Sequence, residues 1–195
     1  QMIAKGHHFP NITLVAIINA DTGLFSADFR GQEHMAQTIT QVSGRAGRAR
    51  QVGEVVIQTR HAAHVTLQTL IKGGYDDFAR SILEERKAGE MPPFAKLALI
   101  KAKSQSMNTS LDFLVKCGAI VKEINKKYAS KVNLIGPYPA PLEKQGGKFR
   151  AHLLLKSKNV ATMQQLLREL VARLDKMKHQ ASLQWYLDVD PGDLT

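Results

Sequence analysis

The sequence predicts an α/β fold in two parts: a strand–helix–strand segment, then an α+β unit of the ferredoxin-like βαββαβ type. Three observations lead to this prediction. Residues 11–21 are an almost unbroken apolar run, typical of a strand buried on both faces of a parallel sheet. Residues 54–60 form a second such run, with a helical pattern before them. Residues 95–190 then alternate between strand and helix patterns.

The helix of the first part is predicted over residues 33–49, with Met35, Ile39 and Val42 on its apolar face. Together with the two strands it forms a βαβ unit, whose crossover is normally right-handed. Two strands make a poor sheet by themselves. Because the sequence also begins without an initiator methionine, we expect a fragment whose remaining strands lie upstream.

Residues 62–90 read as helical, with a break at Gly73 and Gly74. The stretch MPPF at 91–94 stops helical propagation, because proline lacks the amide donor. We therefore predict three regions: residues 1–61, a helical connector at 62–93, and a basic domain at 94–195.

The second part is predicted as a complete small fold. A short strand at 132–136 precedes a proline-rich turn region, PYPAP. The alternating and helical patterns give the order strand, helix, strand, strand, helix, strand, and these elements span 95–103, 107–128, 132–136, 148–156, 160–177 and 182–190. This order predicts a split sandwich with both helices on one face of the sheet.

Charge is concentrated in the second half of the chain. The 195 residues carry a net charge of +10, and 44% of them are hydrophobic, enough for packed cores. Residues 1–93 hold 10 basic and 9 acidic side chains, whereas residues 94–195 hold 17 and 8. A polyanionic partner is therefore expected for the second half.

The single cysteine, Cys117, excludes an internal disulfide and favours a reducing compartment. Its place in an apolar helical pattern favours a buried thiol over a nucleophile. No apolar run approaches the length of a membrane span, and the N-terminus lacks a signal-peptide profile. We expect a cytoplasmic protein with no membrane partner.

Residues 41–50, QVSGRAGRAR, place two glycines and three arginines in a helical pattern. An interior glycine costs a helix about 1 kcal/mol relative to alanine, and like charges four residues apart repel. Gln41, Arg45 and Arg48 follow helical spacing and point to one side. Missing side chains allow another backbone or a ligand to come close, and guanidinium groups suit phosphate. A solvated basic helix end is the alternative.

A second basic cluster, Lys144, Lys148 and Arg150, spans a glycine-bearing loop and the start of a strand. Backbone amides and cations in such a loop can follow a phosphate chain without reading bases. The alternative is a solvated hairpin loop. The nearby sequence QGGKFR contains Gly-Gly-Lys but does not join a strand to a helix, so it is not a nucleotide-binding lysine loop.

The motif at residues 41–48, QVSGRAGR, matches the superfamily 2 helicase pattern Gln-x-x-Gly-Arg-x-Gly-Arg. QMIAKGHHFPNITLV resembles the helicase motif that precedes it, with Lys5 and Gly6 in the loop before the strand. With PPF, GPYPAPLEKQGGKFR and LDVDP, the chain resembles the primosomal protein N′ family of bacterial replication-restart DNA helicases over essentially its whole length.

The resemblance implies that residues 1–61 are the C-terminal part of a second RecA-like helicase lobe, which closes over ATP and Mg²⁺. It implies that Arg48 is the arginine finger, that Arg45 contacts the γ-phosphate or adjacent acidic groups, and that Gln41 orients the site. Gly44 and Gly47 then permit close approach to the opposite lobe. The resemblance also implies that three residues of the loop before the first strand contact DNA, namely Lys5, Gly6 and His7.

The chain contains neither the G-x-x-x-x-G-K-[ST] loop nor a D-E-x-H motif, so the resemblance implies half of an ATP site. Zinc is expected in the full-length protein, but one cysteine cannot hold zinc tetrahedrally in this chain. Two departures from the family stand out. His8 replaces a common acidic residue, and Ala151 with His152 replaces an aromatic-containing pair, which favours backbone contacts over base stacking.

The resemblance implies the C-terminal portion of an ATP-driven 3′-to-5′ DNA helicase for fork restart and primosome assembly. The partners it implies are forked or branched DNA, single-stranded DNA, the acidic tail of single-stranded-DNA-binding protein and other primosome proteins. The fragment alone is expected to hydrolyse nothing. The alternative is a non-enzymatic nucleic-acid-binding adaptor built on the ferredoxin-like half. An unrelated superfamily 2 RNA helicase is disfavoured, because its motif lacks the downstream signatures.

Overall fold

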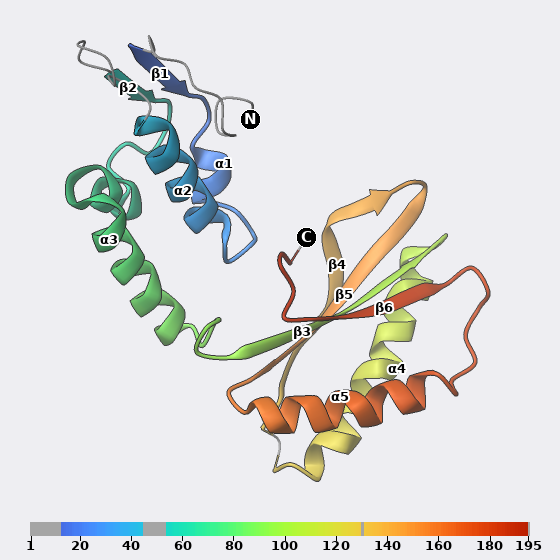
Figure 1. Ribbon diagram of the computed structural model, residues 1–195. Helices are drawn as coiled ribbons and strands as arrows, with labels where there is room; N and C mark the ends of the chain where they lie inside the picture. The colour runs from blue at the N-terminus through green and yellow to red at the C-terminus, as the bar shows by residue number, and fades with distance from the viewer. Residues whose placement is uncertain (1–12, 45–53, 130, 195) are drawn as a thin grey trace. The chain divides into compact units, whose positions relative to one another are not determined.

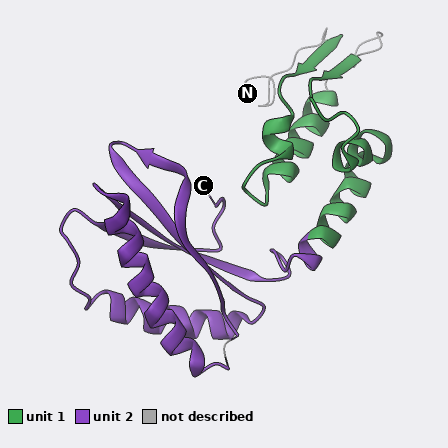
Figure 2. Ribbon diagram, turned by 180° about the vertical axis from the view of Figure 1, so that it is seen from behind, with its two compact units in different colours: residues 1–85 green, residues 86–195 purple. Residues whose placement is uncertain are grey.

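The computed structural model describes residues 13–44, 54–129 and 131–194, which form a mixed α/β protein (Figure 1). The chain divides into two compact units, residues 1–85 and residues 86–195, coloured separately in Figure 2. The described strands form one sheet in each unit. The predicted boundaries at 61 and 93 are not tested by this two-way division and stay predictions.

The first unit has a parallel pair of strands with helices packed beside it. Its elements are β1 (Leu14–Ile17), α1 (Asp21–Leu24), α2 (Gly31–Ser43), β2 (Glu54–Ile57) and α3 (Val65–Ala88). β1 and β2 are parallel, with Leu14 opposite Glu54. The strand–helix–strand order is therefore confirmed for the described residues. The buried residues between the helices are Ala20, Leu24, Met35, Ala36, Ile39, Leu67, Leu70, Phe78 and Ile82.

Three details of the first unit bear on the sequence pattern. β1 ends at Ile17, and Asp21, predicted at the end of that strand, begins α1. The Asp21 carboxylate accepts hydrogen bonds from the Thr59 hydroxyl and the Arg60 amide, contacts that lower the pKa of Asp21. α2 ends at Ser43, and the rest of its predicted range, from residue 45, lies outside the described residues. In α3 the predicted break is confirmed at Gly74, whose φ of 76° is non-helical.

The second unit has the predicted element order. Its elements are β3 (Lys96–Ser104), α4 (Met107–Lys126), β4 (Asn133–Gln145), β5 (Lys148–Ser157), α5 (Val160–Leu174) and β6 (Gln184–Val189). The strands lie in the order β4-β5-β3-β6, and every neighbouring pair is antiparallel. β3 and β5 are the two central strands.

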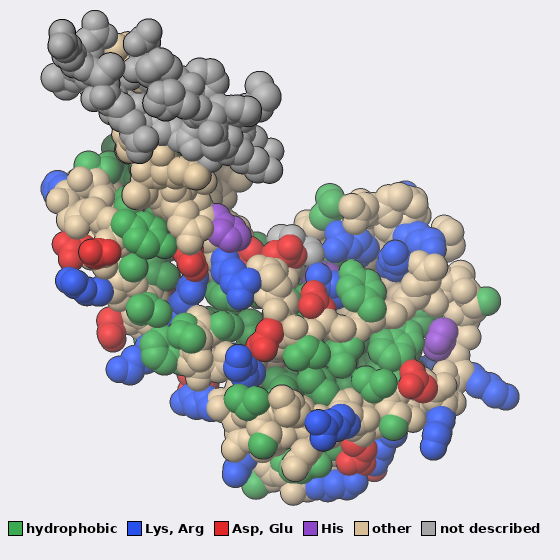
Figure 3. All heavy atoms as spheres, in the orientation of Figure 1, with side chains coloured by type: hydrophobic (Ala, Val, Ile, Leu, Met, Phe, Trp, Pro, Cys, Tyr) green, Lys and Arg blue, Asp and Glu red, His purple; other side chains and the backbone are tan. Residues whose placement is uncertain are grey.

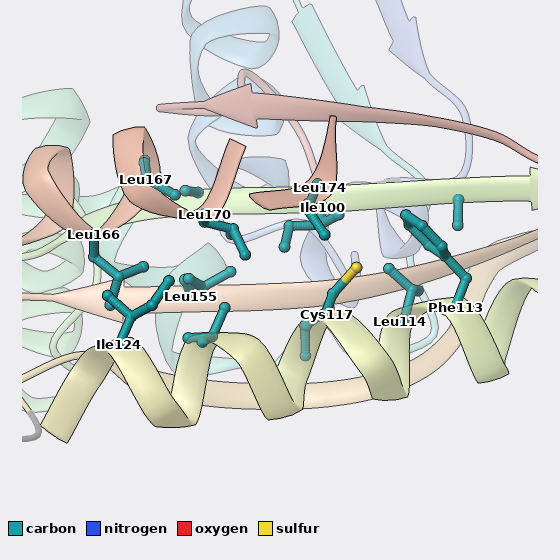
Figure 4. Close-up of a cluster of buried hydrophobic side chains, with 14 of the residues drawn as sticks. Ile100, Phe113, Leu114, Cys117, Ile124, Leu155, Leu166, Leu167, Leu170 and Leu174 are labelled. Atoms are coloured by element: carbon teal, nitrogen blue, oxygen red, sulfur yellow. The ribbon is translucent and has the colours of Figure 1, made fainter. Parts of the chain in front are cut away.

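Both helices of the second unit pack on the same face of this sheet (Figure 4). Alternate residues of β3 and β5 reach that core, among them Ile100 and Leu155, which lie near Leu114 and Leu170 of the helices. Cys117 is fully buried there, and burial raises the pKa of its thiol to about 12. A thiol held protonated in this way is inert, as expected for a core residue.

The prediction of a short strand at 132–136 followed by a turn was wrong. β4 continues to Gln145, through Pro137, Pro139 and Pro141. Proline is tolerated in this strand because β4 is an edge strand, whose outer amides have no ladder partner to lose. The prolines do interrupt the pairing, since the register with β5 shifts on both sides of Tyr138 and Pro139.

Within the ranges that the structure describes, no helix is long and apolar enough to cross a membrane.

Candidate nucleic-acid interface

The face of the four-stranded sheet that α4 and α5 leave uncovered is here called the helix-free face. On β3, Ala98, Ile100 and Ala102 point to the helices, so the alternating residues point the other way. The same alternation applies to β5 and β6, where Leu153 and Leu187 contact the helical core. The side chains on the helix-free face therefore include Lys101, Lys103, Lys148, Arg150, His152, Gln184, Tyr186 and Asp188.

Four cations, Lys101, Lys103, Lys148 and Arg150, share the helix-free face and are called the basic face below. Lys103 lies directly opposite Arg150 in the pairing of β3 with β5. Like charges in such a cross-strand pair destabilise a sheet by several tenths of a kcal/mol. Among the described residues no carboxylate forms an ion pair with Lys103, Lys148 or Arg150. The uncompensated positive charge of these side chains favours the binding of an anion to the basic face.

The β4–β5 hairpin positions two of the sequence-predicted residues. Gly146 and Gly147 form its two-residue turn with φ of 57° and 77°, and Gln145 pairs with Lys148. A turn with positive φ at both positions matches the twist of the strands and strongly favours glycine. Lys148 Nζ donates to Gln184 Oε1 at 3.1 Å, which holds the hairpin against β6.

Lys144, the third predicted residue of this cluster, lies on the opposite side of the hairpin. It pairs with Phe149, which precedes Arg150 in β5 and so points to the other face. Its ammonium group lies 5.0 Å from the centre of the Phe149 ring, a cation–π distance. The structure thus brings Lys148 and Arg150 together and separates Lys144 from them. Whether any of the three contacts DNA stays a prediction.

Lys101 extends the basic face toward its centre. Its side chain is only 11% exposed, and its Nζ lies 3.4 Å from Asp188 Oδ2. It also lies 5.8 Å from the centre of the Tyr186 ring, which is itself 45% exposed. Figure 3 shows Lys and Arg side chains gathered near the β4–β5 hairpin. Proteins that bind single-stranded nucleic acids use exposed aromatic rings beside cations as surfaces on which bases stack.

His152 lies beside Lys101 in the sheet and has no exposed surface. Neither ring nitrogen has a hydrogen-bond partner among the described residues. Burial lowers the pKa of His152 to about 4, the charges of Lys101 and Arg150 act in the same direction, and Asp193 acts against them. Tyr138 packs edge-on against the imidazole at 6.0 Å, and burial raises the pKa of its phenol. His152 is therefore neutral near pH 7.

Gln41 and Gly44 are the described residues of the arginine motif. Gln41 is exposed near the end of α2. Gly44 follows the helix with φ of −65°, which any residue adopts, and an added Cβ there lies 3.5 Å from the nearest atom. Within the described part of the chain, neither this φ nor the nearest atoms require glycine at 44. The remaining predicted residues of the first unit, Lys5, Gly6, His7, Arg45, Gly47 and Arg48, lie outside the described residues.

Sequence reasoning missed Lys101, Lys103 and Tyr186 as site residues. The signal for the lysines was present, because the alternation in AKLALIKAK places both on the face opposite the apolar residues. For Tyr186, next to Trp185 in a terminal strand, the sequence does not tell an exposed ring from a core one. Across the described ranges, no group of three or more His, Cys, Asp or Glu side chains has a geometry that could hold a metal ion.

Comparison with known proteins identifies the second unit. The model of the family "Primosomal protein N C-terminal domain" matches residues 87–192. The chain is 44% identical to "Replication restart protein PriA" of Haemophilus influenzae over 196 residues, covering 100% of this chain and 26% of that protein. It is 35% identical to the protein of the same name from Rickettsia typhi and 30% identical to that from Bacillus subtilis, each over 98% of the chain.

The chain spans about a quarter of the length of these relatives. A designed protein, Foldit4, matches 48% of the chain and 96% of its own length at a TM-score of 0.33 and 12% identity, too weak a likeness to carry an argument. The family model, by contrast, covers more than half of the chain. The chain therefore belongs to the primosomal protein N C-terminal domain family.

Proposed function

We propose that this chain supplies the nucleic-acid-binding C-terminal domain of a bacterial replication restart protein. The cross-strand pair Lys103–Arg150, with Lys148 beside it, is the observation that carries the proposal. These cations share one face without a described carboxylate partner, inside the segment that the family model matches. A strand of phosphates relieves the repulsion between them, and forked or single-stranded DNA is the anion that fits a restart protein.

The strand order of the second unit supports the ferredoxin-like interpretation, because two central antiparallel strands carry both helices on one face. The parallel pair β1–β2 with α2 supports the interpretation of the first unit as part of a RecA-like lobe. The matches to the relatives extend over the first unit as well, which favours a helicase over an adaptor made of the second unit alone.

We propose further that Gln41, Arg45 and Arg48 supply the arginine half of an ATP site in a 3′-to-5′ DNA helicase. Gly44 supports this, because its φ of −65° requires no glycine, and a residue without a side chain permits a close approach. ATP with Mg²⁺ binds only when the other lobe completes the site. Any zinc belongs to the longer protein, which acts in the cytoplasm with single-stranded-DNA-binding protein and other primosome proteins.

The DNA-binding proposal is tested by the dissociation constant of the 195-residue chain for a forked oligonucleotide across a salt series. In the double variant Lys148→Ala/Arg150→Ala we expect about tenfold weaker binding at low salt, because two phosphate contacts are lost. The magnitude of the slope of log dissociation constant against log salt concentration decreases by about 2 for the same reason.

The matched control is Lys176→Ala/Lys178→Ala, which removes the same charge from two exposed residues between α5 and β6. This control is expected to bind within about twofold of the parent. If the two double variants lose affinity equally, net charge alone explains the binding, and the basic face is not the interface.

A further inference from the structure

We propose that the helix-free face binds single-stranded nucleic acid in preference to a duplex, with unstacked bases on two tyrosine rings and phosphates on the cations beside them. The inference rests on the proposed nucleic-acid binding and names the class of ligand. The two rings belong to Tyr138 and Tyr186, which lie on β4 and β6, the two edge strands of the sheet.

The register of the sheet places both tyrosines in one row. Tyr138 of β4 pairs with His152 of β5. His152 pairs with Lys101 of β3, which in turn pairs with Tyr186 of β6. Directly paired residues lie on the same face of a sheet, so these four residues form one row across the helix-free face, here called the tyrosine row. Its two ends are about 14 Å apart, because neighbouring strands are about 4.8 Å apart.

The tyrosine row is accessible at its two ends and closed between them. Tyr186 is 45% exposed and Tyr138 is partly exposed, whereas His152 and Lys101 are buried. The Tyr138 ring stands edge-on to the imidazole, with ring centres 6.0 Å apart. The centre of the Tyr186 ring lies 5.8 Å from Lys101 Nζ. Each ring is therefore supported by a buried neighbour and keeps exposed surface on which a base can stack.

A second row, beside the first, carries the charge that a nucleic-acid strand requires. Lys103 of β3 pairs with Gln184 of β6 and with Arg150 of β5. These residues lie two positions along their strands from the tyrosine row, a displacement of about 7 Å. A nucleotide spans this displacement between its phosphate and its base. A strand that crosses the sheet can therefore set phosphates on Lys103 and Arg150 while its bases reach the tyrosine rings.

Stacking on these rings selects single strands, because the faces of a base in a duplex are covered by its neighbours. Aromatic side chains on a four-stranded sheet are one established means of holding two or three bases of a single strand. The sequence indicates that Ala151 and His152 replace an aromatic-containing pair. The register brings two other rings, from the edge strands, to the same part of the sheet.

The test is the dissociation constant of the 195-residue chain for a mixed-sequence single-stranded oligonucleotide that forms no hairpin, and for the duplex with its complement. In Tyr138→Leu and in Tyr186→Leu we expect about tenfold weaker binding to the single strand, because one stacked base is lost. Duplex binding is expected to fall by at most about twofold. The ratio of variant to parent is expected to stay constant as salt rises, because stacking is not screened by ions.

Two further variants serve as controls. Tyr186→Phe restores the ring and is expected to recover binding to the single strand. Tyr75→Leu removes a partly exposed tyrosine of the first unit and is expected to bind as the parent does. In the unaltered chain, the ring protons of Tyr138 and Tyr186 are expected to shift as the single strand is added. This measurement decides the question if a leucine variant fails to fold.

Losses on the single strand in both leucine variants, with recovery in Tyr186→Phe, support the proposal. Equal losses on single strand and duplex, a loss confined to one ring, or unmoved ring protons overturn the tyrosine row and leave the proposed function standing. If the parent binds neither the single strand nor the duplex, the proposed function falls and the tyrosine row with it.

Discussion

In the longer protein that the relatives' lengths indicate, Arg48→Ala is expected to lower DNA-stimulated ATP hydrolysis by about 10³-fold or more. The reason is that an arginine finger neutralises charge that develops on the transferring phosphoryl group. Binding to forked DNA is expected to stay within about twofold of the parent, since the basic face lies in the second unit.

The measurement is steady-state ATP turnover with and without DNA, beside fork binding on the same preparations. Arg50→Ala is the matched control, because it removes the same side chain two positions beyond the motif. Normal turnover in Arg48→Ala contradicts the finger assignment. A parallel loss in Arg50→Ala indicates a general role of positive charge instead.

Titration of His152 is expected to lower the free energy of unfolding at acidic pH. Because burial lowers the pKa of His152 to about 4 from an ordinary 6.5, the unfolded chain binds the proton more tightly than the folded chain. The free energy of unfolding therefore keeps its full value above pH 6.5 and decreases progressively as the pH falls toward 4. At pH 4.5 the loss from this one group amounts to about 2–3 kcal/mol of unfolding free energy.

The variant His152→Leu removes the titrating group and keeps a similar volume. Between pH 7 and pH 4.5 its unfolding free energy is expected to fall by about 2–3 kcal/mol less than that of the parent, measured by urea unfolding. His179→Leu is the control, since His179 is exposed between α5 and β6. Identical pH dependence in the parent and in His152→Leu contradicts a neutral, buried imidazole.

The element order of the second unit was predictable from local patterns, because β3 and α4 each bury one face and so leave a periodic apolar signal. The extent of β4 was not predictable in this way. Prolines at 137, 139 and 141 are turn signals in any local reading, and only the edge position of the strand makes them compatible with a sheet.

The candidate site was predicted in part for a similar reason. Lys148 and Arg150 are close in sequence to a glycine turn, so a basic hairpin could be expected. Their pairing with Lys103 depends on the long-range register of β3 with β5, which no local pattern encodes. Likewise α1 is only four residues long. It is held by the hydrogen bond between Asp21 and Thr59, a residue that follows β2 in the chain and is distant from α1 in sequence.

We expect nucleic acid to bind the helix-free face of the four-stranded sheet. The most direct measurement is a residue-by-residue map of amide chemical-shift changes as an oligonucleotide is added to the 195-residue chain. The largest changes are expected at the amides of five residues of this face: Lys101, Lys103, Lys148, Arg150 and Tyr186. Changes confined to α4 and α5, with those five amides unmoved, contradict it.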